Sequence, residues 1–129
     1  PCKADDILIG RYGTPFFQIC RGLEGSYNVA LIRAEPDEGL LDREYLYHFL
    51  RQKRLHDLLL HLGTRTAQEG IEMDILESYP IPLPPMPQQQ EIACNFSRLD
   101  ILASCAETRL RGIEEVSRSI IETEIGTEL

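Results

Sequence analysis

The sequence lacks several features that identify an enzyme or a secreted scaffold directly. Its 129 residues contain no tryptophan, and the four cysteines, Cys2, Cys20, Cys94 and Cys105, are scattered without a CxxC pair. Dense or paired cysteines are typical of disulfide scaffolds and zinc sites, so we expect these four to be free thiols. The longest apolar runs are much shorter than the roughly 20 residues of a membrane span. We therefore expect a soluble, cytoplasmic protein with no membrane partner.

Catalytic and metal-binding patterns are missing as well. His48, His56 and His61 have no carboxylate or cysteine at ligand spacing, and we interpret them as surface or packing residues. The glycines within residues 10–14 and 22–26 match neither a P-loop nor a dinucleotide fingerprint. Because no base, nucleophile or metal set can be assembled, we predict a protein with no catalysis, no metal and no cofactor of its own.

The charge of the chain is strongly negative but unevenly distributed. The formal net charge is −8, which argues against nucleic acid because Lys and Arg supply most of the affinity for phosphates. Residues 1–70 hold 9 Lys and Arg against 10 Asp and Glu, a net charge of −1. Residues 71–129 hold 4 against 11, a net charge of −7. The acidic excess therefore belongs to the C-terminal part, and nucleic acid remains open for the N-terminal part.

Three short apolar runs predict a small antiparallel sheet in the first third of the chain. They cover residues 5–10, 16–20 and 27–32, and glycine, proline or acidic residues lie beside them. Residues 21–26 have the length and composition of a hairpin loop, so we expect the second and third runs to pair as a hairpin. Helical patterns follow, which makes the predicted fold class α+β, with a small mixed α/β domain.

The helical patterns begin at Asp42, a residue type that is preferred at the N-cap of a helix. The spacing of the apolar residues that follow loses its phase at residues 51–54 and then resumes. This slip predicts two short helices instead of one. Gly63 is expected to end the second helix, and residues 64–70 are expected to form a polar loop.

Residues 79–87 are rich in proline, which lacks an amide donor and fixes φ, so they must form an edge strand or a polyproline segment. Pro87 suits the first turn of a helix, and helical periodicity follows it. Apolar or small residues recur at alternating steps of four and three, which predicts a coiled-coil-forming helix. The residues of this seam that we assign to a helix-partner interface are Ile92, Phe96, Leu99, Ala103, Ala106, Leu110, Ile113 and Ile120.

A helix over residues 87–129 would be roughly 65 Å long, more than a module of fewer than ninety residues can cover. Leaving the seam in water would forgo about 1.5 to 3 kcal/mol of burial for each large apolar side chain. A partner helix is therefore expected. The alternative is that the seam folds back on its own domain, since Ser117 and Glu124 weaken it distally.

Arg, Gln, Thr, Ser and Tyr are frequent in the predicted loops. Arg and Gln can bond guanine and adenine edges in a bidentate manner, and the hydroxyl side chains commonly hold phosphates. This composition favours nucleic-acid binding only weakly, because polar loops are common. The alternative function is a protein-interaction adaptor whose helix dimerises and which has no role with nucleic acid.

The order of five segments resembles the DNA specificity subunit of type I restriction-modification systems. The segments are Asp-Ile-Leu-Ile-Gly-Arg-Tyr-Gly-Thr at residues 6–14, Tyr-Asn-Val-Ala-Leu-Ile at 27–32, Tyr-Leu-Tyr-His-Phe-Leu at 45–50, Gly-Thr through Ala-Gln-Glu-Gly-Ile at 63–71, and Ile-Pro-Leu-Pro-Pro-Met-Pro with a glutamine at 81–89. The resemblance extends nearly from end to end.

This resemblance implies a target recognition domain at residues 1–86 and a long conserved spacer helix at residues 87–129. Loops of such a domain enter the grooves of double-stranded DNA. Two domains, held apart by antiparallel helices, read the two halves of a bipartite target. The family also places further residues before the strand at residues 6–10, so we expect the later part of a recognition domain, as a fragment or a half-subunit. Gln88 stands where the family usually has Glu.

The resemblance also implies the partners. The helices would dock methyltransferase (modification) subunits, which would bind S-adenosylmethionine, and the restriction subunit is a further candidate. The helix would pair either with that of a second recognition domain or with a second copy in a homodimer. The chain itself would be a reader without catalysis.

The DNA-contact candidates come from the loops. Residues 64–68 match the family motif most closely, whereas Arg21 is chosen for its loop chemistry alone. Arg51, Lys53 and Arg54 could touch phosphates or form a solvated helix face. The predicted DNA-contact residues are Arg11, Tyr12, Thr14, Arg21, Ser26, Tyr27, Thr64, Arg65, Thr66 and Gln68.

Overall fold

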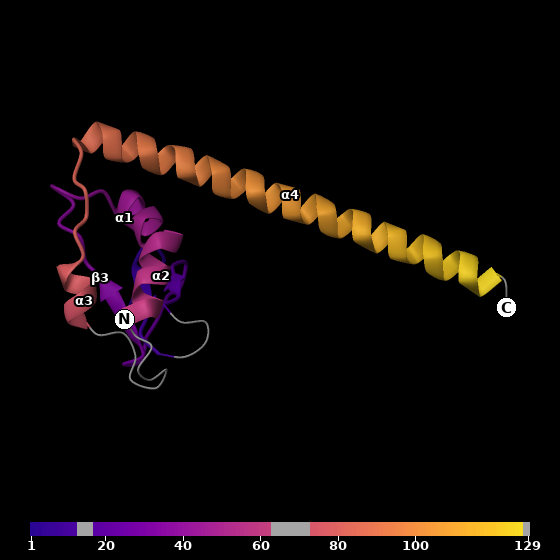
Figure 1. The fold of residues 1–129 in the computed structure, drawn as a ribbon, viewed down its shortest axis with the longest axis horizontal. Helices are drawn as coiled ribbons and strands as arrows, with labels where there is room; N and C mark the ends of the chain where they lie inside the picture. Colours follow the sequence, from indigo (N-terminus) through magenta and orange to yellow (C-terminus); the bar gives the residue numbers. More distant parts are fainter. Residues whose placement is uncertain (13–16, 63–72, 128–129) are drawn as a thin grey trace. The chain divides into compact units, whose positions relative to one another are not determined.

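The computed structural model describes residues 1–12, 17–62 and 73–127. The chain divides into two compact units, Pro1–Ala93 and Cys94–Leu129, which we call unit 1 and unit 2 (Figure 1). Within its described residues, unit 1 holds a small sheet and three short helices, so the predicted α+β fold is confirmed. All four cysteines are free.

In the part of unit 1 that the structure describes, three antiparallel strands form a sheet in the order β2-β1-β3. These strands are β1 at Ile7–Gly10, β2 at Ile19–Cys20 and β3 at Leu31–Ala34. Leu8 of β1 pairs with Cys20 on one side and with Arg33 on the other. The predicted antiparallel sheet is confirmed, but the predicted hairpin is wrong, because β2 and β3 both pair with β1. The most apolar run takes the central position, where both its edges are bonded and its residues are buried, while β2 and β3 are half-buried.

Two of the strands are shorter than the sequence pattern predicts. Before β3, the Asn28 side chain accepts a hydrogen bond from the Ala30 amide at 3.0 Å, and this local turn keeps residues 27–30 out of the strand. Before β2, Phe17 has a φ of 53°, in the left-handed region that a strand does not use. Its ring is nevertheless buried in the core. Local turns therefore replace the predicted strand starts.

Two helices cover the core, as the slip in the apolar pattern predicts. They are α1 at Arg43–Leu50 and α2 at Lys53–Leu62. The Asp42 side chain accepts a hydrogen bond from the Tyr45 amide at 2.9 Å, which confirms the predicted N-cap. The core joins β1 to both helices, and its buried residues are Ile7, Ile9, Phe17, Leu46, Phe49, Leu50, Leu55 and Leu59.

A third short helix, α3 at Met73–Ser78, packs Ile75 and Leu76 against this core. The sequence pattern did not predict it, because six residues are too few to establish a helical period. Tyr79 follows and lies with its ring centroid 5.9 Å from that of Phe49. The proline-rich residues 80–85 then belong to no helix or strand, so of the two predicted forms the edge strand is wrong.

The last helix, α4, spans Met86–Thr127, with Pro87 in its first turn as predicted. Its first residues belong to unit 1, where the Gln89 side chain is buried. The Gln89 amide group accepts from the Asp42 N–H at 2.8 Å and donates to the carbonyls of Leu40 and Pro84, both at 2.9 Å. These three bonds connect the start of α4 to the loop that caps α1. None of the helices in the described ranges combines the length and apolarity that a bilayer span requires.

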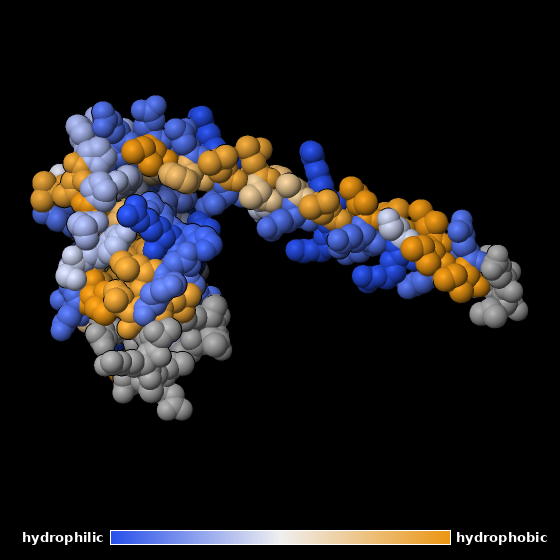
Figure 2. All heavy atoms as spheres, in the orientation of Figure 1, coloured by the Kyte–Doolittle hydropathy of each residue, from blue (hydrophilic) through white to orange (hydrophobic). Residues whose placement is uncertain are grey.

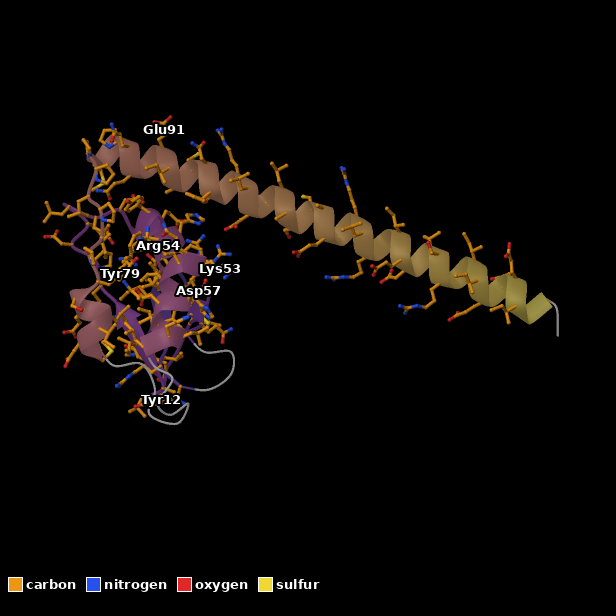
Figure 3. The ribbon with its side chains drawn as sticks, in the orientation of Figure 1. Tyr12, Lys53, Arg54, Asp57, Tyr79 and Glu91 are labelled. Atoms are coloured by element: carbon orange, nitrogen blue, oxygen red, sulfur yellow. The ribbon has the colours of Figure 1, made fainter. Side chains whose placement is uncertain are left out.

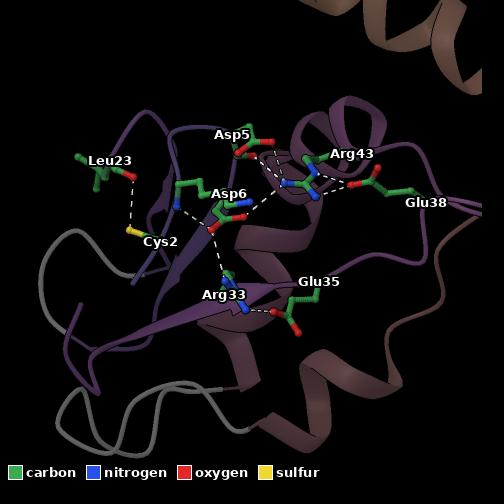
Figure 4. Close-up of polar contacts among 9 residues, drawn as sticks. Cys2, Asp5, Asp6, Leu23, Arg33, Glu35, Glu38 and Arg43 are labelled. Atoms are coloured by element: carbon green, nitrogen blue, oxygen red, sulfur yellow. Dashed lines mark hydrogen bonds and ion pairs between the residues drawn. The ribbon is translucent and has the colours of Figure 1, made fainter. Parts of the chain in front are cut away.

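A cluster around Asp6 connects the N-terminal loop, β3 and α1 (Figure 4). The buried Asp6 carboxylate accepts from the Lys3 amide at 2.9 Å and lies 3.3 Å from the Arg43 guanidinium and 3.5 Å from that of Arg33. The Lys3 amide and the two guanidiniums hold the pKa of Asp6 below its usual 3.8, although burial opposes this shift. The charged carboxylate is therefore part of the folded state.

Replacing Asp6 by Asn is expected to lower the melting temperature at neutral pH. The pKa of Asp6 is lower in the folded chain, so its stabilisation is complete above the usual value of 3.8 and is lost as pH falls through the folded pKa. The wild-type and Asp6→Asn melting temperatures should thus converge below pH 3.8. Thermal melts across pH 2 to 8, with the exposed Asp5→Asn as the matched variant, measure this. A constant difference at every pH would contradict the role of the Asp6 charge.

Candidate nucleic-acid interface

Arg11 lies directly after β1 and is held beside the start of β3. Its amide donates to the Ala30 carbonyl at 2.8 Å, and its guanidinium lies 5.3 Å from the centroid of the Tyr12 ring. The Arg11 Nε is buried and has no hydrogen-bond partner within the described residues. A buried donor without an acceptor costs about 1 to 3 kcal/mol.

Arg11 and Tyr27 line one open hollow of about 480 Å³ along β3. The sequence separates these two candidates, and the pairing of β1 with β3 brings them to the same surface. Arg33 also lines the hollow, although the sequence did not single it out, and it is already paired with Asp6. Figure 3 shows Tyr12 at one end of unit 1 and Glu91, in the first turns of α4, at the other.

A second cluster forms around Tyr47 of α1. The Arg21 guanidinium lies 4.0 Å from the centroid of the Tyr47 ring, and the Arg51 guanidinium lies 5.0 Å from it. Arg21 also forms an ion pair with Glu44. Arg21 thus has protein partners and does not line the hollow of Arg11. Sequence reasoning missed Tyr47, although its spacing of four residues from Arg51 places the two side chains side by side on a helix.

A third surface lies beside α2. An open hollow of about 250 Å³ is lined by the apolar side chains of Phe17, Ile19 and Leu50 and by Arg51, Lys53 and His56. The Lys53 ammonium lies 2.6 Å from the Asp57 carboxylate and lowers the pKa of Asp57. Part of the local positive charge is therefore balanced within the helix. Phosphate contact and a solvated face both remain predictions for this surface.

The other candidates are divided between described and undescribed segments. Ser26 is exposed in the loop between β2 and β3. Thr14, Thr64, Arg65, Thr66 and Gln68 lie outside the described residues. Within the three described ranges, no group of three or more His, Cys, Asp or Glu side chains could hold a metal ion.

The predicted seam of α4 is exposed in the single chain. Leu110 and Ile113 are 60% and 63% exposed, and Ile92, Phe96, Leu99 and Ile120 are exposed as well. Ala103 and Ala106 also face solvent. Figure 2 shows apolar side chains, drawn in orange, along the length of α4, which is labelled in Figure 1. A partner helix remains a prediction, and the exposed seam is the surface it would use.

These features define a two-part α+β module, in which arginine and tyrosine side chains line the surface of a small domain and a long helix exposes an apolar seam. The chain belongs to the family described as the type I restriction modification DNA specificity domain, which it matches over residues 3–115. The resemblance that the ordered motifs indicate is thereby confirmed.

A relative in Methanocaldococcus jannaschii is the type I restriction enzyme MjaVIII specificity subunit. It is 24% identical over 118 residues, which cover 92% of this chain and 27% of the relative. The chain therefore spans about a quarter of the length of that protein. No solved structure matches the chain.

Proposed function

We propose that this chain is a DNA-reading part of a type I specificity subunit. It binds double-stranded DNA sequence-specifically, recognises one half of a bipartite target, and carries out no catalysis itself. The observation that carries the proposal is the family match over residues 3–115. The name of the archaeal relative, a specificity subunit, supports it.

The hollow of Arg11 and Tyr27 is the favoured contact surface among the described residues. An arginine guanidinium can bond guanine in two places, and a tyrosine hydroxyl can hold a phosphate. Residues 1–70 carry a net charge of only −1, whereas the later residues are strongly acidic and repel phosphates. DNA is therefore expected at the end of unit 1 that holds Tyr12, remote from the start of α4 (Figure 3).

The partners follow from the same proposal. The exposed seam of α4 would dock methyltransferase subunits and the helix of a second recognition domain or a second copy, with the restriction subunit as a further candidate. S-adenosylmethionine would then be bound by the methyltransferase subunit and not by this chain. Such a complex would act on DNA in the cytoplasm.

Replacing Arg11 by Ala is expected to weaken or relax recognition of one half-site by about 1 to 3 kcal/mol, the size of a lost bidentate base contact. The measurement is methylation of genomic sites by the complete subunit with its methyltransferase partner, together with binding to target duplexes at fixed salt. Arg118→Ala, which removes an exposed arginine of unit 2, is the matched control and should leave the half-site preference unchanged.

Two results would contradict these assignments at different levels. If the Arg11→Ala variant leaves methylation unchanged at every genomic site, the assignment of Arg11 to the DNA interface is wrong. If deleting the gene that encodes this chain leaves the genomic methylation pattern unchanged, the proposed function is wrong. The adaptor alternative instead predicts a salt-insensitive dimer that does not bind mixed duplex DNA at low salt, whereas a DNA reader should show steep salt dependence.

A further inference from the structure

Val29 is the most exposed of the large apolar side chains in the described ranges, at 86%. It lies in the loop between β2 and β3 and lines the same hollow as Arg11 and Tyr27. Single exposed apolar side chains are common on protein surfaces, so exposure by itself assigns no role. The position of Val29 beside two predicted DNA-contact residues is the feature that points to a ligand.

The turn that carries Val29 is held by three hydrogen bonds. The Asn28 carbonyl accepts from the Leu31 amide at 3.1 Å, which closes a β-turn with Val29 at its first corner. The Asn28 side chain accepts from the Ala30 amide at 3.0 Å, and the Ala30 carbonyl accepts from the Arg11 amide at 2.8 Å. Turn corners favour Gly, Pro, Asn, Asp and Ser, so the turn itself does not require a valine. The backbone therefore presents this side chain at a fixed place beside Arg11.

The chemistry of the hollow combines one apolar group with polar ones. Glu35 also lines it but is paired with Arg33, so the charge of this carboxylate is balanced. In the major groove of DNA, thymine presents an apolar 5-methyl group beside the polar edges of the base pairs. Phosphates and the minor groove offer no such methyl group. A branched side chain on a fixed turn has few rotamers to lose on contact, so the methyl group is a suitable partner for Val29.

We propose that Val29 contacts the 5-methyl group of a thymine in the DNA target and so favours an A·T pair at one position. Arg11, which is bonded to the same turn, supplies the polar contact next to it. Val29 is thus a specificity-determining residue of this surface. This inference rests on the proposed function, because it names one base feature that the hollow reads.

The test is a double-mutant cycle on the complete specificity subunit with its methyltransferase partner. One probe is the target duplex identified by mapping genomic methylation, and the others have single thymines replaced by deoxyuridine, which lacks only the 5-methyl group. Fluorescence anisotropy at fixed salt measures binding. At one position, deoxyuridine should weaken wild-type binding about fourfold, the effect of one buried methyl group. Val29→Ala should weaken binding of the thymine duplex by about the same factor, and deoxyuridine at that position should then have no further effect.

Two variants serve as controls. Val29→Ile keeps a branched apolar side chain and should keep the preference for thymine over deoxyuridine. Leu23→Ala removes another exposed apolar side chain of the same loop, which lies outside the lining of the hollow, and should change neither affinity. Because an apolar contact releases no counterions, Val29→Ala should also leave the salt dependence of binding unchanged.

The outcomes separate this inference from the proposed function. If deoxyuridine has no effect at any position, or the same effect in the wild type and in Val29→Ala, the thymine contact is wrong while the proposed function stands. A target without any A·T pair in the half-site would have the same meaning. If the wild-type complex binds the mapped target and a shuffled duplex equally well, the proposed function itself is wrong.

Discussion

Gln89→Leu is expected to lower the free energy of unfolding of unit 1 by about 3 kcal/mol, because three hydrogen bonds are lost at once and their backbone partners stay in the interior. Gln89 is 1% exposed, and its single amide group serves the N–H of Asp42 and the carbonyls of Leu40 and Pro84. Leucine fills similar space but offers neither a donor nor an acceptor. The start of α4 should therefore separate from the loop that caps α1 more readily.

Tyrosine fluorescence during urea unfolding measures this effect selectively, since all five tyrosines precede residue 94 and belong to unit 1. Gln88→Leu, at the exposed neighbouring position, is the control and should be nearly neutral. Gln89→Glu should also destabilise at neutral pH, because a carboxylate would face two carbonyl oxygens. That loss should decrease as the new carboxyl is protonated at low pH. A stable Gln89→Leu chain would show that the three bonds contribute little.

Leu55→Ala is expected to cost about 3 kcal/mol, within the range of about 2 to 5 for a large aliphatic side chain removed from a core. Leu55 is 1% exposed and belongs to the core cluster that joins α2 to β1. Its removal leaves a cavity that the neighbouring sheet and helices can fill only partly.

Leu60→Ala is the matched control in the same helix, because Leu60 is 39% exposed and should cost much less. The same fluorescence measurement applies. Equal losses at the two positions would contradict the assignment of Leu55 to the core, whereas a large loss at Leu55 alone supports it. Neither residue touches the hollow of Arg11, so target preference should be unchanged in whatever fraction of the Leu55→Ala chain stays folded.

The two tests also bear on the proposed function, because a DNA-binding surface needs a stable fold beneath it. The hollow of Arg11 and Tyr27 is formed by the pairing of β1 with β3, and β1 is held by the core that contains Leu55. If a variant loses DNA recognition, its free energy of unfolding must therefore be measured as well. The Arg11→Ala variant, whose residue follows β1 and is only half-buried, separates the two effects.

Several features of the fold follow from local patterns in the sequence. Asp42 caps α1 because a short carboxylate can accept from an amide three residues later. The break in the spacing of apolar residues at residues 51–54 separates α1 from α2. The helix α4 extends over 42 residues, with Pro87 in its first turn. The ordered motifs also identified the family. Each of these depends on residues that are close in the chain, so a sequence pattern can show them.

Only the tertiary structure decided which distant residues meet. The expected hairpin failed because strand order depends on which run is most fully buried, and β1 took the centre between β2 and β3. The contacts of Gln89 with Leu40 and Asp42, and of Arg21 with Tyr47, join residues far apart in sequence. Such contacts arise when the apolar faces pack and the remaining polar groups find partners, and no local spacing encodes them. The sequence alone therefore determined the longer helices, the presence of an antiparallel sheet and the family. Packing determined the strand order, the short helix α3 and how the candidate surface is assembled.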